Sequence, residues 1–130
     1  MIFQTLHLHR DPRGVVSLTL QTPERRNVLS PLMIAELTEF ARTVGQDQET
    51  RVVVLGGAGN VFCAGGDLGW MRAQLDADRA QRLAEARKLA MMMHALNTLP
   101  VPLIGRLHGG AFRGGIGLAC VCDMAIAARG

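Results

Sequence analysis

Apolar residues recur at steps of three and four positions in two long parts of the chain, and each part is predicted to form a helix. In residues 31–44 this spacing is typical of an amphipathic helix with one apolar face. Ser30 is placed to cap its first turn and Pro31 suits the first helical position, while Gly45 is expected to end it. A second helix is predicted over Asp76–Asn97. Its inward face is expected to carry Leu83, Ala86, Ala90, Met93 and Leu96.

Shorter apolar runs outside these helices predict strands. Val52–Leu55 is an unbroken apolar run, which is typical of a strand buried on both faces, and Leu103–Leu107 is predicted to be a second buried strand. Nearer the N-terminus, Phe3–His9 and Gly14–Leu20 lie on either side of the turn sequence Asp11–Gly14, so we expect a β-hairpin there. Because helical patterns alternate with strands, the predicted fold class is α/β with parallel strands.

The composition fits one soluble domain with a dispersed basic surface. The chain has 130 residues, 48% of them hydrophobic, which is enough to build a core. Its net charge of +3 comes from thirteen arginines and one lysine that are scattered rather than clustered. Four phenylalanines, one tryptophan and no tyrosine are few for stacking on bases. We therefore expect no nucleic-acid partner, whereas an anionic small molecule would suit such a surface.

The cysteines and histidines do not indicate a metal site. The three cysteines, Cys63, Cys120 and Cys122, are an odd number and lack the paired spacing of zinc ligands. His7 and His9 share one face of a predicted strand, but no third ligand lies nearby in the sequence. The simplest interpretation is a reduced cytoplasmic protein without a bound metal, in which Cys63 packs rather than reacts.

No segment is predicted to enter a membrane. The longest apolar stretch, Gly114–Ala128, is shorter than a bilayer requires and contains Asp123. The N-terminal residues lack the basic region and the apolar run of a secretory signal. Both observations favour a cytoplasmic location with no membrane partner.

Two glycine-rich stretches each follow a predicted buried strand. Six glycines fall within residues 105–117, at the start of a helix predicted over Gly114–Val121, and Gly65 and Gly66 follow the apolar Val61–Ala64. Glycine loses more backbone freedom on folding than other residues, so this density indicates that the backbone approaches another group closely. The start of a helix also leaves backbone N–H groups free to bind an anion.

Known phosphate-binding sequences do not explain these glycines. Gly109 and Gly114 have the spacing of a P-loop, but Gly115 and Ile116 stand where a lysine and a hydroxyl residue are required. A dinucleotide-binding fingerprint fails as well, since no GxGxxG motif follows the first strand. Two glycine-rich turns that faced one another would instead bring two backbone N–H groups to one point, as in an oxyanion hole.

The two stretches resemble the motifs of the crotonase superfamily, the enoyl-CoA hydratases and isomerases. The resemblance rests on Cys63–Leu68, with Trp70 and Met71 after it, on His108–Ala127, and on Pro23–Ser30 upstream, so it covers essentially the whole chain. It implies a crotonase-like repeated β-β-α superhelix with parallel sheets flanked by helices. Residues 1–130 would then be the N-terminal part of a single domain, truncated before its C-terminal helical part.

The resemblance also implies a site and an activity. The amides of Gly66 and Gly114 would polarise the thioester carbonyl of an acyl-CoA, and Arg25 lies where phosphate contacts begin. The backbone expected to meet the adenine end and the pantetheine arm of coenzyme A is that of Ala64, Asp67 and Leu68. Coenzyme A would arrive as part of the substrate, with no separate cofactor. The implied reaction is syn addition of water to a 2,3-enoyl-CoA.

Two departures from the family pattern limit this assignment. Arg113 replaces the first glycine of the second motif's glycine triplet, and Gly117 occupies the place of the first catalytic glutamate. The general acid or base is therefore expected beyond Gly130. The sequence looks most like hydratases of branched or carboxylated enoyl-CoAs, such as the methylglutaconyl-CoA and isohexenylglutaconyl-CoA hydratases. Two alternatives remain. One is another reaction of the superfamily, by an isomerase, a decarboxylase or a dehalogenase, and the other is an inactive fragment that only binds acyl-CoA.

The resemblance carries an expectation about assembly. Full-length members form homotrimers, or hexamers made of two trimers, through their C-terminal helices. In a chain of 130 residues the apolar faces of Val52–Leu55 and Asp76–Asn97 would be under-covered, and unusual association would follow.

Overall fold

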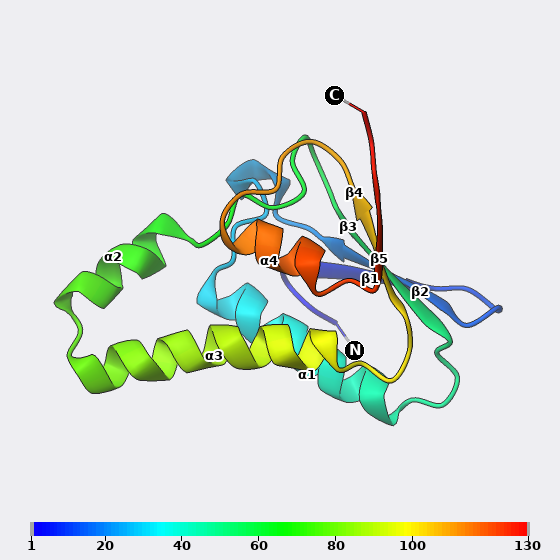
Figure 1. Ribbon diagram of the computed structural model, residues 1–130, viewed down its shortest axis with the longest axis horizontal. Helices are drawn as coiled ribbons and strands as arrows, with labels where there is room; N and C mark the ends of the chain where they lie inside the picture. The colour runs from blue at the N-terminus through cyan, green and yellow to red at the C-terminus, as the bar shows by residue number, and fades with distance from the viewer. Residues whose placement is uncertain (1, 130) are drawn as a thin grey trace.

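The computed structural model describes residues 2–129, which form one five-stranded sheet with helices packed on it (Figure 1). The strands, in chain order and in spatial order, are β1 (Leu6–Arg10), β2 (Val15–Leu20), β3 (Val52–Gly57), β4 (Leu103–Leu107) and β5 (Met124–Ala127). The helices are η1 (Pro23–Arg25, a 3-10 turn), α1 (Pro31–Gln46), α2 (Leu68–Asp76), α3 (Arg79–Asn97) and α4 (Gly114–Cys120). The predicted α/β class is confirmed.

The sheet combines one hairpin with parallel crossovers. Strands β1 and β2 pair antiparallel, so the predicted hairpin is confirmed, although β1 begins at Leu6 rather than Phe3. Strands β2 to β5 all run parallel, because a helical connection separates each from the next. The predicted strand Leu103–Leu107 has the expected bounds. Strand β5 was not predicted, since its four residues merge in the sequence with the apolar helix before them.

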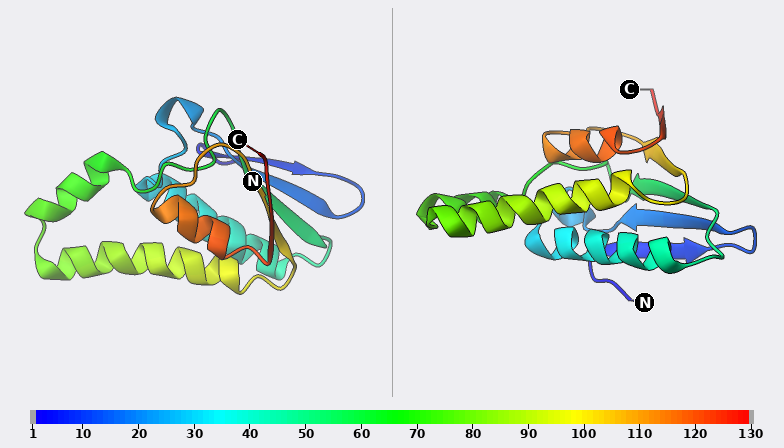
Figure 2. Two further views of the ribbon diagram at one scale, coloured as in Figure 1. Left: turned by 45° about the horizontal axis from the view of Figure 1, so that its top comes forward. Right: turned by 60° about the horizontal axis from the view of Figure 1, so that its bottom comes forward.

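One face of the sheet forms the core, and the helices cover that face (Figure 2). Leu18, Val53 and Leu55 point into it and are fully buried, together with Leu37 of α1 and Leu118 of α4. The expectation that Val52–Leu55 is buried on both faces is wrong for this chain. Alternate residues of this strand, Val52 and Val54, are only half-buried, because helices pack against one side of the sheet.

Helix α1 matches its prediction closely. The Ser30 hydroxyl accepts a hydrogen bond from the amide of Met33 at 3.1 Å, as expected of a cap. The helix continues through Gly45 and ends after Gln46, so Gly45 does not terminate it. Its buried face contains the predicted apolar residues and also Glu36, which the periodicity did not indicate. The Glu36 carboxylate accepts hydrogen bonds from the amides of Gln4 and Thr5 and from the Thr5 hydroxyl, and so holds the N-terminal segment against α1.

The predicted helix Asp76–Asn97 corresponds to α3, which starts three residues later, whereas the separate helix α2 before it was not predicted. Helix α2 ends at Asp76, and α3 starts after Asp78, whose carboxylate accepts a hydrogen bond from the amide of Gln81 at 2.8 Å. Met92 and Leu96 form the buried face of α3, whereas Leu83 is 58% exposed. The inward face was therefore predicted correctly only near the C-terminal end. In Figure 1, α2 and the first half of α3 extend away from the sheet, and Leu75 and Leu83 in these segments are exposed.

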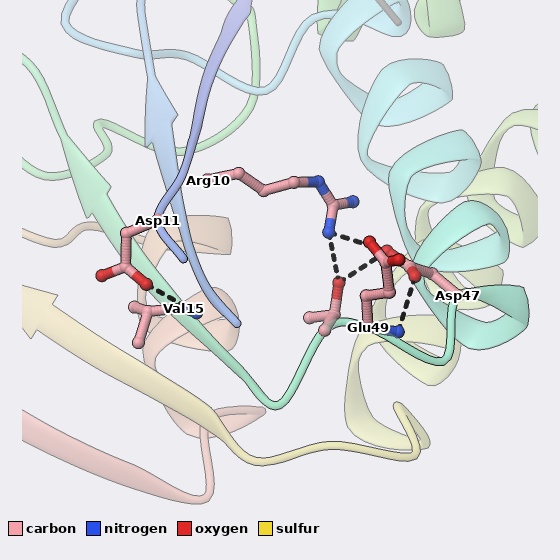
Figure 3. Close-up of polar contacts among 6 residues, drawn as sticks. Arg10, Asp11, Val15, Asp47 and Glu49 are labelled. Carbon is pink, nitrogen blue, oxygen red and sulfur yellow. Dashed lines mark hydrogen bonds and ion pairs between the residues drawn. The ribbon is translucent and has the colours of Figure 1, made fainter. Parts of the chain in front are cut away.

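A polar cluster joins the end of β1 to the loop after α1, at the opposite end of the sheet from the glycine-rich turns. The Arg10 guanidinium lies 2.7 Å from Asp47 and also donates to the Thr50 hydroxyl (Figure 3). Asp47 in turn accepts from the Glu49 amide and the Thr50 hydroxyl. These hydrogen bonds, of which the one from the Glu49 amide has the largest effect, hold the pKa of Asp47 below its ordinary value. The cluster fixes the chain where it enters β3.

Candidate functional site

The first glycine-rich turn follows β3 and is braced by the segment after η1. The Leu29 amide donates to the Gly65 carbonyl at 2.7 Å, and the Asp67 amide donates back to the Leu29 carbonyl at 3.1 Å. Asn27 is fully buried, and its side-chain amide contacts the carbonyls of residues 58, 61 and 62 at 2.8 to 3.2 Å. The turn at Gly65 and Gly66 is therefore held by the backbone upstream of α1.

The second glycine-rich turn, between β4 and α4, packs directly on the first. The Phe62 amide donates to the Gly110 carbonyl, and the Phe112 amide donates to the Cys63 carbonyl, each at 3.0 Å. A Cβ at Gly115 would lie only 2.4 Å from the Cys63 carbonyl oxygen, so a larger residue cannot fit without displacing the backbone. These contacts explain the glycine density: two backbone segments lie against one another with no room for side chains.

Gly66 and Gly114 meet where the two turns pack together. A Cβ built on Gly114 would lie 4.0 Å from the Gly66 nitrogen, and one built on Gly65 would lie 3.5 Å from the Gly114 nitrogen. Within residues 2–129, neither the Gly66 amide nor the Gly114 amide donates a hydrogen bond. The predicted juxtaposition is present, and its chemical consequence is two neighbouring backbone donors without acceptors. What they bind stays a prediction.

Arg25 and Asp67 form an ion pair at the edge of these turns. Asp67 is 8% exposed, and its carboxylate also caps α2 by accepting from the amides of Gly69 and Trp70. Burial alone would raise the pKa of Asp67, but the hydrogen bonds from Trp70, Gly69 and Arg25 together hold it below its ordinary value. The carboxylate therefore stays charged at neutral pH and anchors Arg25, whose side chain remains 56% exposed.

The other residues predicted to contact coenzyme A lie on the same loop. The Ala64 amide donates to the Arg26 carbonyl at 3.0 Å, so it is already engaged within the protein. Leu68, the first residue of α2, is 67% exposed and offers an apolar surface beside the Arg25–Asp67 pair. The structure thus places Ala64, Gly66, Asp67, Leu68 and Gly114 on or directly beside the two packed turns, and Arg25, at the end of η1, is joined to them by its ion pair with Asp67.

No acid or base accompanies the two amides at Gly117. A Cβ at this position would lie 3.0 Å from the terminal methyl of Met93, so α4 faces an apolar part of α3 here. Cys63 is fully buried, as expected of a packing residue, and burial raises the pKa of its thiol. Burial, with Asp123 nearby, also raises the pKa of Cys122 to about 11. Both thiols are therefore protonated at neutral pH.

Other features of the described residues lie apart from this site. An apolar groove of about 920 Å³ runs between α1 and α3, where Pro31, Ile34, Leu83 and Met91 contribute to its walls. Residues 2–129 contain no group of three or more histidine, cysteine or acidic side chains arranged to hold a metal ion. None of the helices in this range is both long and apolar enough to cross a membrane.

Comparisons with known proteins agree with this geometry. The profile of the family described as "Enoyl-CoA hydratase/isomerase" matches residues 10–130. The "Probable enoyl-CoA hydratase echA6" of Mycobacterium tuberculosis is 39% identical over 115 residues, which are 88% of this chain and 44% of that protein. Among solved structures, an enoyl-CoA hydratase from Shewanella pealeana superposes with a TM-score of 0.92 at 34% identity, covering 96% of this chain and 47% of that one. An enoyl-CoA hydratase from Mycobacterium smegmatis gives a TM-score of 0.90 at 41% identity, covering 95% and 48%. The chain spans less than half the length of these relatives.

Proposed function

Because this chain belongs to the enoyl-CoA hydratase/isomerase family and has its crotonase-type α/β fold, we propose that it carries the thioester-polarising part of an enoyl-CoA hydratase. The proposed reaction is syn addition of water across the 2,3-double bond of an enoyl-CoA. The observation that supports it most directly is the pair of free amides at Gly66 and Gly114.

These amides suit a thioester carbonyl whose oxygen gains negative charge. When water attacks the β-carbon of an enoyl-CoA, charge moves onto the thioester oxygen and gives an enolate. Backbone donors fixed before the reaction stabilise such an oxygen without reorganising, and each is worth about 3–4 kcal/mol in other oxyanion holes. The donors of this chain are held by hydrogen bonds between backbone segments on both sides of Gly65 and Cys63, so they are preorganised.

The edge of the two turns, together with the end of η1, would hold coenzyme A. Arg25 presents a half-exposed guanidinium suited to a phosphate, and Asp67 holds it in place. The backbone of Ala64, Asp67 and Leu68 would border the pantetheine arm and the adenine. Coenzyme A enters as part of the substrate, so the proposal requires no separately bound cofactor.

Proton transfer must come from groups other than position 117. Gly117 has no side chain, and the neighbouring Met93 cannot donate or accept a proton in this role. We place the general acid and base in the part of the family fold that this chain does not span. By the same family analogy, the whole protein would be a cytoplasmic homotrimer or hexamer.

Within the family, hydratases of branched or carboxylated enoyl-CoAs are the closest resemblance of the motifs, and we propose this substrate class. An isomerase or decarboxylase would share the same two amides and differ in its acid and base. A second candidate function follows from Gly117: without a proton-transfer group, the chain could bind acyl-CoA and not turn it over.

A pair of substitutions at one position tests the amide directly. Gly114 is the first residue of α4, where its N–H makes no intrahelical hydrogen bond, so the missing N–H of a proline breaks none. Gly114→Pro removes the proposed donor, whereas Gly114→Ala adds the same Cβ and keeps the N–H; this Cβ would lie 2.8 Å from the Leu29 side chain, its nearest neighbour. The activity of the whole protein is measured as the loss of the conjugated-thioester absorbance of a branched 2-enoyl-CoA, and affinity is measured by calorimetry with a saturated acyl-CoA.

The outcomes separate the candidates. The hydratase with this oxyanion hole is supported if the wild type hydrates the enoyl-CoA and the rate of Gly114→Pro is about 100-fold or more below that of Gly114→Ala. Binding of the saturated acyl-CoA without turnover of any enoyl-CoA supports the binding module. Equal turnover by the two variants would exclude the Gly114 amide as a donor. The absence of both binding and turnover would overturn the proposed function.

A further inference from the structure

Arg113 adopts a backbone conformation that suits glycine rather than arginine. Its φ of 51° and ψ of −115° lie outside the left-handed helical region that polar residues such as Asn27 occupy at modest cost. Glycine reaches this region freely because it has no Cβ, so Arg113 destabilises the turn relative to glycine. An unfavourable residue that persists at a site points to a role for its side chain.

The position of Arg113 connects it to the proposed thioester site. It directly precedes Gly114, and its Cβ lies 3.0 Å from the position that a Cβ on Gly65 would occupy. The residue therefore stands on the second turn where that turn touches the first. Its side chain starts beside the two free amides, and its backbone is fixed by the packing that creates them.

The Arg113 guanidinium has no partner in the part of the chain that the structure describes. The residue is exposed, and no carboxylate or other acceptor of residues 2–129 pairs with it. Arg25, by contrast, lies at the end of η1 and is anchored by Asp67. An unpaired cation at this point is available to an anion on a bound ligand.

We propose that Arg113 is a specificity-determining residue that binds a carboxylate on the acyl chain of the substrate. This inference rests on the proposed function, because it requires the thioester carbonyl to lie at Gly66 and Gly114. The acyl chain begins at that carbonyl, so a carboxylate a few carbons along it comes within reach of the neighbouring guanidinium. The phosphates of coenzyme A are separated from the thioester by the pantetheine arm, and a contact between them and Arg113 would affect acyl-CoAs with and without a carboxylate equally.

Affinity for non-reacting thioesters tests this role without depending on turnover. The probes are a pair of saturated acyl-CoAs of equal length, one ending in a carboxylate and one ending in a carboxamide. They are measured by calorimetry on the wild type and on Arg113→Gln, which keeps the length of the side chain and loses its charge. Arg51→Gln is the matched control, because it removes an exposed arginine at the opposite end of β3.

We expect the wild type and Arg51→Gln to bind the carboxylate probe about tenfold more tightly than the carboxamide, which corresponds to about 1.4 kcal/mol. Arg113→Gln should lose this preference, and Arg113→Lys should keep part of it. Equal affinity of the wild type for both probes would overturn the inference and leave the acyl-CoA site intact. Uniform weakening of both probes by Arg113→Gln would also overturn it, since that result indicates a contact with coenzyme A. If neither probe binds, the proposed function itself fails.

Discussion

Replacing Asn27 with alanine should destabilise the protein severely, because one buried side chain holds the first glycine-rich turn. The Asn27 amide nitrogen donates to the carbonyls of Ala58, Val61 and Phe62, and its oxygen accepts from the Thr22 amide at 2.9 Å. The residue is fully buried, so water cannot reach these groups without a local opening. The Asn27→Ala variant removes all of these contacts together.

The magnitude follows from what is left unpaired. If two of the four backbone groups stay without partners, the loss is about 2–6 kcal/mol, since each buried orphan costs about 1–3 kcal/mol. Asn27 has a φ of 55°, a conformation that asparagine tolerates and alanine does not, which adds about 1 kcal/mol. The expected loss is therefore about 3–7 kcal/mol, a large part of the stability of an ordinary domain.

Urea unfolding followed by circular dichroism measures this loss, with Asn97→Ala as the control. Asn97 is the exposed last residue of α3, and its replacement should change stability by less than about 0.5 kcal/mol. A loss below about 1 kcal/mol for Asn27→Ala would refute the reasoning, because it would mean that water or local rearrangement satisfies the freed carbonyls.

Asn27→Asp gives a second measurement that does not require the alanine variant to fold. Its carboxylate would face three carbonyl oxygens, so its pKa in the folded state should rise above the ordinary value near 3.9. A raised pKa means that the protonated form is favoured in the folded state, and stability is lost as pH rises through the folded pKa. The variant should therefore be more stable in mild acid than at neutral pH, relative to wild type.

Three further predictions concern other positions. Gly115→Ala should cost at least about 3 kcal/mol in urea unfolding, since its Cβ would lie 2.4 Å from a carbonyl oxygen, whereas Gly45→Ala, with no atom within 4 Å, should gain up to about 1 kcal/mol. The pKa of Glu36 is lowered, because the hydrogen bonds that its carboxylate accepts from Thr5 and Gln4 outweigh the effect of burial. The stability that Glu36 contributes is therefore present above about pH 4.5 and is lost as pH falls through the folded pKa, and Glu36→Gln should reduce this loss of stability in acid. Arg113→Gly should raise the free energy of unfolding by about 1 kcal/mol, and with it the urea midpoint, because glycine adopts a positive φ without strain; an unchanged midpoint would contradict this expectation.

The fold could be predicted from the sequence wherever one local pattern determined it. Helix α1 has a capping serine, a proline at its first position and a continuous apolar face, and all of these signals agree. Helix α2 was not predicted in the same way, because it has no buried face and its apolar residues Leu68, Met71 and Leu75 are exposed. Apolar spacing shows which face a helix could bury, but a partner surface decides whether it does.

The candidate site was only partly predictable for a related reason. Glycine density indicated close backbone packing, and the motifs indicated which glycines meet. The bracing by Asn27 depends on a left-handed turn at Arg26 and Asn27 that joins segments more than 30 residues apart, and no local pattern reports such a contact. Arg113 is the opposite case, because an arginine in place of a motif glycine was visible in the sequence. The structure adds that Arg113 has a positive φ, which destabilises the turn relative to glycine.

The way the two turns are held explains why side chains beside them can vary. Gly66 and Gly114 are positioned by hydrogen bonds from Leu29 to Gly65 and from Phe112 to Cys63, all between backbone atoms. A substitution at position 113 or 117 changes charge or shape at the site but removes none of these bonds. The geometry that would polarise a thioester is thus separable from the side chains that select the acyl group or move the proton. A chain with arginine at 113 and glycine at 117 can therefore keep the first property while altering the others.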